Sequence, residues 1–172
     1  MLKAKVNRRA FAEANGYVRG AHEGFPIDSI GKIGKPNCAE RPNVVLLLAG
    51  TYDVVFNVNL KDAPNTLSHI IDDFLLVCPD AVVLVGTLIP LLDENHEARR
   101  ISFNAALTGG VIEQRIRMGK HVLLVDMGRV TREFIDPADG IHPVDEGYKL
   151  IAEAWYEAIV AAGRKGWIGP YS

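Results

Sequence analysis

An aspartate and a histidine stand three residues apart near the end of the chain, in the polar stretch of residues 139–143. A carboxylate at this spacing can hold an imidazole in the orientation that a general base needs. The same pattern is also typical of a plain polar turn, in which Asp139 binds backbone amides and His142 is exposed. The pair alone therefore leaves a catalytic and a structural interpretation open.

A second polar motif, Gly50-Thr51-Tyr52-Asp53, follows the aliphatic run of residues 44–50. This run is too short for a helix and is rich in β-branched and aliphatic residues, so it predicts a strand buried on both faces. In an open parallel sheet, ligands bind beyond the carboxyl ends of the strands. The motif is therefore expected to line a site through Gly50, Thr51 and Asp53.

Two more runs of the same kind, residues 81–87 and 121–127, predict two further buried strands. The intervals between the three runs are long enough for crossover helices, which favours a parallel sheet. Apolar residues recur with helical spacing in both intervals and after the last run. The expected helices cover residues 63–77 with Asp62 as the N-cap, about 94–118 with a bend or break at Gly109-Gly110, and about 145–162.

This order of elements predicts a three-layer α/β architecture, with helices on both faces of a parallel sheet. The stretch of residues 139–143 directly precedes the last helix, so we expect Asp139 and His142 to lie close together at the carboxyl edge of the sheet. There they should be within reach of residues 51–53. The first 40 residues differ, because glycines and prolines interrupt them and only residues 8–17 predict a short helix.

Composition and charge exclude several classes of function. Lys and Arg number 19 against 21 Asp and Glu, which leaves a net charge of −2 and no basic surface for a nucleic-acid partner. The longest apolar stretch, residues 81–92, is shorter than the roughly 20 residues of a membrane span, so no membrane partner is expected. Cys38 and Cys78 match no metal-ligand spacing, which predicts two buried residues, at most one disulfide, and no metal site.

Several motifs together resemble the SGNH hydrolases, also called GDSL-like esterases. The most specific are Gly50-Thr51-Tyr52-Asp53, residues 139–143 before the last helix, and Glu146-Gly147-Tyr148 at its start. Supporting phrases include His22-Glu23-Gly24 and residues 42–46, 78–81 and 119–127. The likeness is closest to secreted fungal carbohydrate esterases of the acetyl-xylan type. It divides the chain into residues 1–20, which carry no resemblance, and an incomplete domain over residues 21–172.

The resemblance implies a flavodoxin-like sheet and the hydrolysis of a small-molecule or carbohydrate ester without a cofactor. In this family a serine is the nucleophile, an aspartate orients a histidine base, and a glycine and an asparagine donate to the oxyanion. Asp139 and His142 occupy the family's aspartate and histidine positions. Gly24 stands nearest to the oxyanion glycine. Tyr52 occupies the position of the asparagine, where it either donates its phenol or packs.

The family's nucleophile belongs to a Gly-Asp-Ser motif at the end of a first strand, and this sequence contains no such motif. None of its four serines follows a buried strand; they are Ser29, Ser68, Ser102 and Ser172. The simplest interpretation is truncation or divergence that removed the family's first strands. Two functions then compete: an ester hydrolase without its serine, and an inactive family member that at most binds a ligand.

The resemblance also implies five strands, with the nucleophile's strand beside residues 44–49. Without that neighbour, the strand exposes unpaired backbone groups, so we expect low stability as a monomer or self-association through this edge. The resemblance further implies secretion, although the first residues lack the apolar core of a signal peptide.

Overall fold

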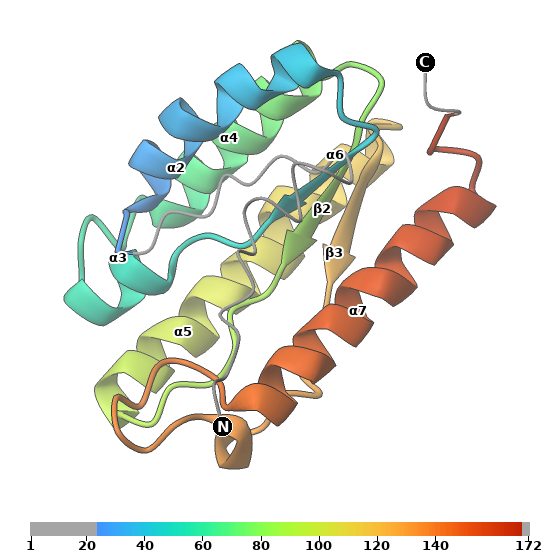
Figure 1. The fold of residues 1–172 in the computed structure, drawn as a ribbon. Coiled ribbons are helices and arrows are strands. Elements are labelled where there is room, and N and C mark those ends of the chain that lie inside the picture. Colours follow the sequence, from blue (N-terminus) through green and yellow to red (C-terminus); the bar gives the residue numbers. More distant parts are fainter. Residues whose placement is uncertain (1–23, 170–172) are drawn as a thin grey trace.

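The computed structural model describes residues 24–169 (Figure 1). Three strands form one sheet in the order β1-β2-β3, and both pairs are parallel. They are β1 (Val44–Leu47), β2 (Val82–Gly86) and β3 (Val122–Val125). The helical elements are α2 (Ile27–Gly34), η1 (Lys35–Glu40), α3 (Thr51–Phe56), α4 (Ala63–Val77), α5 (Glu94–Ala106), η2 (Leu107–Ile112), α6 (Glu113–Arg117), η3 (Arg132–Phe134) and α7 (Asp145–Arg164).

The three strands lie inside the three predicted runs and are joined by helical crossovers. Val44 of β1 is opposite Val82 of β2, and Val83 of β2 is opposite Val122 of β3. The connection from β1 to β2 contains α4, and the connection from β2 to β3 contains α5 and α6. The predicted α/β fold with a parallel sheet is therefore confirmed.

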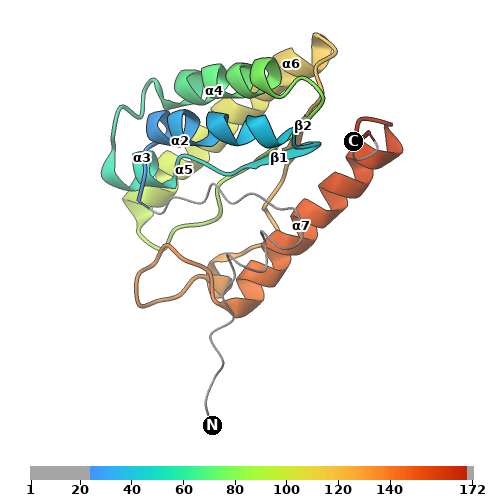
Figure 2. The same ribbon diagram turned by 45° about the horizontal axis from the view of Figure 1, so that its top comes forward.

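Helices cover both faces of this sheet. Figure 2 shows α2, α4, α5 and α6 on one side of the sheet and α7 on the other. One cluster of buried side chains fills the space between the sheet and the first group of helices, and a smaller cluster lies beneath α7. The arrangement has the three layers that the sequence predicts.

Burial differs between the centre and the edge of the sheet. All five residues of β2 are buried. The prediction that residues 44–50 are buried on both faces is wrong for one face, since Leu46 is 48% exposed and Leu48 is 39% exposed. Leu47 and Ala49, which point to the opposite face, are buried. The difference arises because α7 packs mainly on β2 and β3.

The segment before β1 contains a helix that the sequence pattern did not reveal. Helix α2 and the 3-10 helix η1 occupy a region in which glycines and prolines predicted irregular structure. The glycines serve packing: a Cβ at Gly31 would lie 2.6 Å from Ile70, and one at Gly34 would lie 2.8 Å from Phe74. Glycine at both positions therefore lets α2 approach α4 closely. The short helix predicted over residues 8–17 lies outside the described residues.

The predicted helix over residues 94–118 is confirmed with one irregularity. Its middle is the π-helical turn η2, so Gly109 and Gly110 widen the helix instead of breaking it. Gly119 has a φ of 71° directly after this helical stretch, as is common for glycine beyond a helix C-terminus. Asp62 is the N-cap residue of α4 as predicted, but its side chain accepts a hydrogen bond from the Asn65 side chain (3.0 Å) and caps no backbone amide.

Helix α7 ends at Arg164, two residues beyond the expected end at residue 162. It docks on the sheet through side chains that include the buried Ala154 and Ala162. Tyr148, near the start of this helix, is 50% exposed. Among the helices of residues 24–169, none is both long and apolar enough to cross a membrane.

A disulfide joins Cys38 to Cys78 and settles the pairing that the sequence left open. It connects η1 to the residue directly after α4, and both sulfur-bearing side chains are buried. An ion pair between Lys35 Nζ and the Asp73 carboxylate (2.7 Å) joins the same two helical segments. Covalent and polar contacts thus hold the segment before β1 against α4.

Replacing both cysteines, Cys38→Ser with Cys78→Ser, should lower the free energy of unfolding by about 2–4 kcal/mol. The disulfide spans 40 residues, and opening a loop of that length returns conformational entropy to the unfolded chain. Urea denaturation of the two proteins measures the difference. An unchanged midpoint at equal slope would contradict this role of the disulfide.

Candidate active site

The segments that follow the three strands gather at one edge of the sheet. In Figure 1, α3, the loop after β2 and the loop before α7 all lie toward the lower left, beyond the carboxyl ends of the strands. Ligand sites of open parallel sheets form at this edge. The structure places the loop of Asp139 and His142 there, as expected. That the pair reaches residues 51–53 remains a prediction.

The Asp139 carboxylate makes three hydrogen bonds inside its own loop. Oδ1 accepts from the backbone N–H groups of Ile141 (2.7 Å) and His142 (2.9 Å). Oδ2 lies 2.7 Å from Nδ1 of the His142 ring. Both side chains are about half exposed, at 44% and 49% respectively. The loop is therefore a polar turn, as the structural interpretation predicts, and it also orients the His142 imidazole, as the catalytic interpretation requires.

The backbone around this loop is fixed on both sides. The Asp136 N–H donates to the His142 carbonyl (2.8 Å), and the Val144 N–H donates to the Phe134 carbonyl (2.9 Å). Gly140 has a φ of 70°, a conformation that other residues rarely adopt. A Cβ at Gly147, in the first turn of α7, would lie 2.9 Å from the Phe134 carbonyl oxygen. The glycines let the loop close tightly against the start of α7.

The hydrogen bond to Asp139 determines the protonation pattern of the ring. If Nδ1 carries the proton that the carboxylate accepts, the neutral imidazole holds its lone pair on Nε2, which is the state that a general base requires. The backbone N–H of His142, that of Ile141 and the His142 ring together lower the pKa of Asp139 to about 2. The carboxylate therefore stays charged well below neutral pH, and it can stabilise an imidazolium.

A second Asp-x-x-His sequence in the chain shows what is particular to this loop. Asp93 is the N-cap of α5, and its Oδ1 accepts from the backbone N–H groups of Asn95 and His96, both at 2.9 Å. The His96 ring nitrogen, however, lies 3.8 Å from that carboxylate, beyond hydrogen-bond distance. Both aspartates organise the backbone in the same way, but only Asp139 also orients its histidine ring through a hydrogen bond.

The motif after β1 forms a short helix and not an open loop. Gly50 precedes α3 with a φ of 122°, and a Cβ there would lie 2.8 Å from the Phe103 ring of α5. Arg99, also from α5, donates to the carbonyls of Val54 (2.8 Å) and Val55 (3.1 Å) at the end of α3. The position of α3 is therefore set by α5 at both ends.

The residues of this motif point in different directions. Asp53 is buried, and its Oδ2 accepts the backbone N–H of Ile27 (3.0 Å), the first residue of α2. Burial raises the pKa of Asp53, and the Ile27 N–H opposes that rise. Tyr52 is half-buried with its ring 4.6 Å from that of Phe56. A role for Gly50, Thr51, Tyr52 and Asp53 in lining the site stays a prediction.

The remaining candidates are spread over the molecule. Gly24 is exposed with a φ of 74°. Ser29 lies in the first turn of α2. Ser68 is bound to Arg115 (2.8 Å), and Ser102 donates to the Ala98 carbonyl within α5 (3.1 Å). Each of these three serines lies in a helix and not at the end of a strand.

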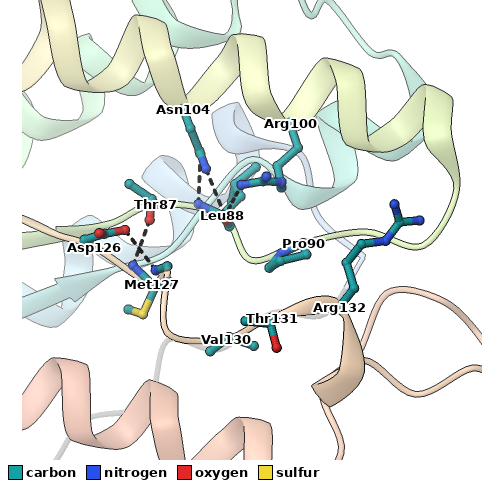
Figure 3. A pocket seen from close by; sticks show the side chains of 11 residues that line it. Thr87, Leu88, Pro90, Arg100, Asn104, Asp126, Met127, Val130, Thr131 and Arg132 are labelled. Carbon is teal, nitrogen blue, oxygen red and sulfur yellow. Dashed lines mark hydrogen bonds between the residues drawn. The ribbon is translucent and has the colours of Figure 1, made fainter.

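A cavity of about 330 Å³ lies between the loops that follow β2 and β3, and the sequence did not indicate it. Figure 3 shows Asn104 reaching from α5 to the loop after β2, where its amide binds both the N–H and the carbonyl of Leu88 (2.9 Å each). Thr87 accepts from the Met127 N–H (2.9 Å), which joins the two loops. None of the predicted site residues lines this cavity.

The charged groups that line this cavity already have partners. Arg100 makes hydrogen bonds to both oxygens of Glu97 (2.6 and 2.8 Å) and to the Leu88 carbonyl (3.1 Å). The guanidinium lowers the pKa of Glu97. Arg132 pairs with Glu94 (2.8 Å) and donates to the Leu92 carbonyl. Through these contacts both arginines hold the loop after β2 in place. The carbonyl groups that these arginines bind lie 12 and 40 residues away in the sequence. The sequence pattern therefore could not predict that the arginines hold this loop.

Within residues 24–169, no three histidine, cysteine or carboxylate side chains lie close enough together to hold a metal ion.

The charge of the Asp139 carboxylate should persist to unusually low pH. Its pKa falls from 3.8 to about 2 on folding, so its contribution to stability is complete above pH 3.8 and is lost as the pH falls through about 2. The carboxyl carbon signal in an NMR titration measures this. His142→Ala removes the ring but keeps the backbone donors, so the Asp139 pKa of that variant should still lie below 3.8. Titration of the unmodified chain near 3.8 would contradict the geometry.

No sequence model of a protein family matches this chain. It is similar to a curated protein named "Putative endoglucanase X" of Acetivibrio thermocellus, with 28% identity over 118 residues. That match covers 67% of this chain and 49% of the relative, so the chain spans about half the length of the curated relative.

Solved structures show the same fold. A family 3 carbohydrate esterase of Clostridium thermocellum is 28% identical, with a TM-score of 0.72 over 86% of this chain and 71% of its own. A family 3 carbohydrate esterase of Talaromyces cellulolyticus is 19% identical, with a TM-score of 0.71 over 84% of this chain and 70% of its own. A GDSL-like lipase of Bacteroides thetaiotaomicron is 17% identical, with a TM-score of 0.72 over 90% of this chain and 80% of its own. The chain is thus similar in fold to carbohydrate esterases of family 3 and to a GDSL-like lipase.

Proposed function

We propose that this chain hydrolyses acyl esters, with His142 as the general base and Asp139 as the residue that orients it. The observation that carries the proposal is the 2.7 Å contact between Asp139 Oδ2 and His142 Nδ1 on the loop before α7. The fold and the esterases among the structural neighbours support it.

The chemistry requires a hydroxyl that attacks the acyl carbon. His142 Nε2 takes the proton of that hydroxyl while its oxygen bonds to the carbon, and Asp139 stabilises the imidazolium that forms. The tetrahedral intermediate then breaks its bond to the leaving oxygen, which receives the proton from the imidazolium. The products are a carboxylic acid and an alcohol when the attacking hydroxyl belongs to water.

Water is the nucleophile that we propose for the described part of the chain. Ser29, Ser68 and Ser102 lie in helices, and the latter two already make hydrogen bonds there. Loss of the serine from a serine-based site costs on the order of 10⁶ in turnover, whereas a positioned general base alone contributes about 10²–10⁴. We therefore propose slow, His142-dependent hydrolysis rather than the rate of a complete esterase.

The proposed substrates are small acyl esters, including acetyl groups on carbohydrates. This class follows from the family 3 carbohydrate esterases to which the chain is similar. The site lies on an exposed loop, where a bulky alcohol portion such as a sugar can remain in solvent while the acyl group is attacked.

Hydrolysis of p-nitrophenyl acetate by the full chain should depend on His142. We expect His142→Ala to remove the catalysed rate, since the base is lost. His96→Ala is the matched control, because His96 belongs to the same Asp-x-x-His pattern but its ring is not hydrogen-bonded to Asp93. That variant should retain the full rate.

Equal rates for the unmodified chain and His142→Ala would refute the proposed hydrolase activity and leave a non-catalytic protein on the same scaffold. Equal losses in both variants would show that exposed imidazoles hydrolyse the ester without a site.

The variant Tyr52→Asn should not raise this rate to that of a complete esterase. An amide at this position can stabilise an oxyanion by a factor of about 10²–10³, but only if the tetrahedral intermediate forms efficiently. Without a serine nucleophile, formation of that intermediate remains limiting. Steady-state turnover of the two proteins gives the comparison. A large increase that disappears in Tyr52→Asn with His142→Ala would reveal a nucleophile within the chain.

A further inference from the structure

We propose that Arg132 is a positioning residue for His142, the candidate general base. Its guanidinium holds Leu92, and Leu92 holds the tip of the loop that carries Asp139 and His142. This inference deepens the proposed function, on which its kinetic consequence rests. Its geometric part can be tested without any ester hydrolysis.

The first link joins the tip of this loop to the loop after β2. The Leu92 N–H donates to the Gly140 carbonyl (3.0 Å), and Gly140 directly follows Asp139. A Cβ at Gly140 would lie 3.2 Å from the Cβ of Leu92, so the two segments are in close contact. Gly140 lies between the Asp139 carboxylate and its two backbone donors, the N–H groups of Ile141 and His142. A shift of Leu92 would therefore pass directly to the turn that Asp139 organises.

The second link joins Leu92 to Arg132. Nη2 of Arg132 donates to the Leu92 carbonyl (2.6 Å), and Nη1 pairs with the Glu94 carboxylate (2.8 Å) at the start of α5. A hydrogen bond from a charged donor is stronger than one between neutral groups, and a planar guanidinium can bind two acceptors in fixed directions. Figure 3 shows Arg132 reaching from the segment after β3 toward the loop after β2. Leu92 is thus held through its carbonyl by Arg132 and through its N–H by Gly140.

Arg132 also begins the segment that leads into the candidate base. It is the first residue of η3, and the next residue after η3, Ile135, forms an antiparallel bridge with Pro143 at the far side of the loop. The base of the loop is therefore closed by its own backbone. The tip is bound to Leu92, which Arg132 holds in place. One arginine thus connects the base of the loop to the residue that anchors its tip.

The pKa of Asp139 reports whether this turn is intact. The backbone N–H of His142 lowers it most, followed by the backbone N–H of Ile141 and the His142 ring. These donors all belong to the loop itself, and each must point at the carboxylate to stabilise its charge. A turn that has lost its anchor at Leu92 holds these donors less firmly, so the pKa of Asp139 should rise.

NMR titration of the full chain tests the geometric part. In Arg132→Ala the pKa of Asp139 should rise from about 2 toward 3.8, and the Leu92 amide should exchange faster with solvent. Arg129→Ala is the matched control, because Arg129 lies in the same segment after β3 but pairs with Glu157 of α7 (2.6 Å). That variant should keep the Asp139 pKa near 2 and the slow exchange of Leu92.

An Asp139 pKa that stays near 2 in Arg132→Ala would overturn the proposal. An equal rise in both variants would also overturn it, since it would show a general loosening of the fold. Should Arg132→Ala fail to fold, Arg132→Lys takes its place. That variant keeps the charge but lacks the planar group that binds both acceptors, so we expect a smaller rise of the Asp139 pKa. No rise in Arg132→Lys would then overturn the proposal.

Turnover of p-nitrophenyl acetate tests the kinetic consequence. Arg132→Ala should lower the His142-dependent kcat by about 10–100-fold with little change in KM, because a misplaced base affects the chemical step more than binding. Arg129→Ala should keep the full rate. Absence of His142-dependent hydrolysis in the unmodified chain would refute the proposed function alone, since the NMR titration still decides whether Arg132 positions the loop. A raised Asp139 pKa with unchanged kcat would overturn the role of Arg132 in positioning the base.

Discussion

A parallel sheet must be covered on both faces, and among the three described strands only β2 meets that condition completely. The hydrophobic contacts of β2 with the helices on either side hold the three layers together. The neighbouring strand β1 is buried on the face toward α2 and α4, but its other face leaves Leu46 and Leu48 half exposed. The central strand is thus fully enclosed between the layers, whereas the edge strand keeps part of its apolar surface exposed.

Loop geometry distinguishes two aspartates that the sequence presents alike. Asp93 and Asp139 each accept two backbone N–H groups from the residues that follow, which is ordinary turn and cap chemistry. Only Asp139 adds a hydrogen bond to a histidine ring. Because that ring lies in a loop fixed to the start of α7, the carboxylate both shapes the loop and orients a base. Residues 139–142 therefore form a turn and also hold the candidate base, His142, beside the carboxylate that orients it.

Local patterns were sufficient to predict the strands and the helices α4 and α7, because their apolar periodicity is strong. They failed at α2, where Gly31 and Gly34 signal irregular structure but actually permit close contact with α4. They also failed for the exposed face of β1, since exposure depends on what a distant helix covers. The closeness of Asp139 and His142 could be foreseen from their spacing, whereas the direction of the Asp53 carboxylate toward Ile27 could not.

The disulfide between Cys38 and Cys78 gives the layer of α2 a dependence on redox conditions. Where thiols are oxidised, a covalent bond holds this helix and η1 to the end of α4. In a strongly reducing medium the same layer would rely on the Asp53 contact to Ile27, the Lys35 pair and the close packing at Gly31. Asp53 belongs to the motif that follows β1, so after reduction of the disulfide this motif would become one of the main polar attachments of α2.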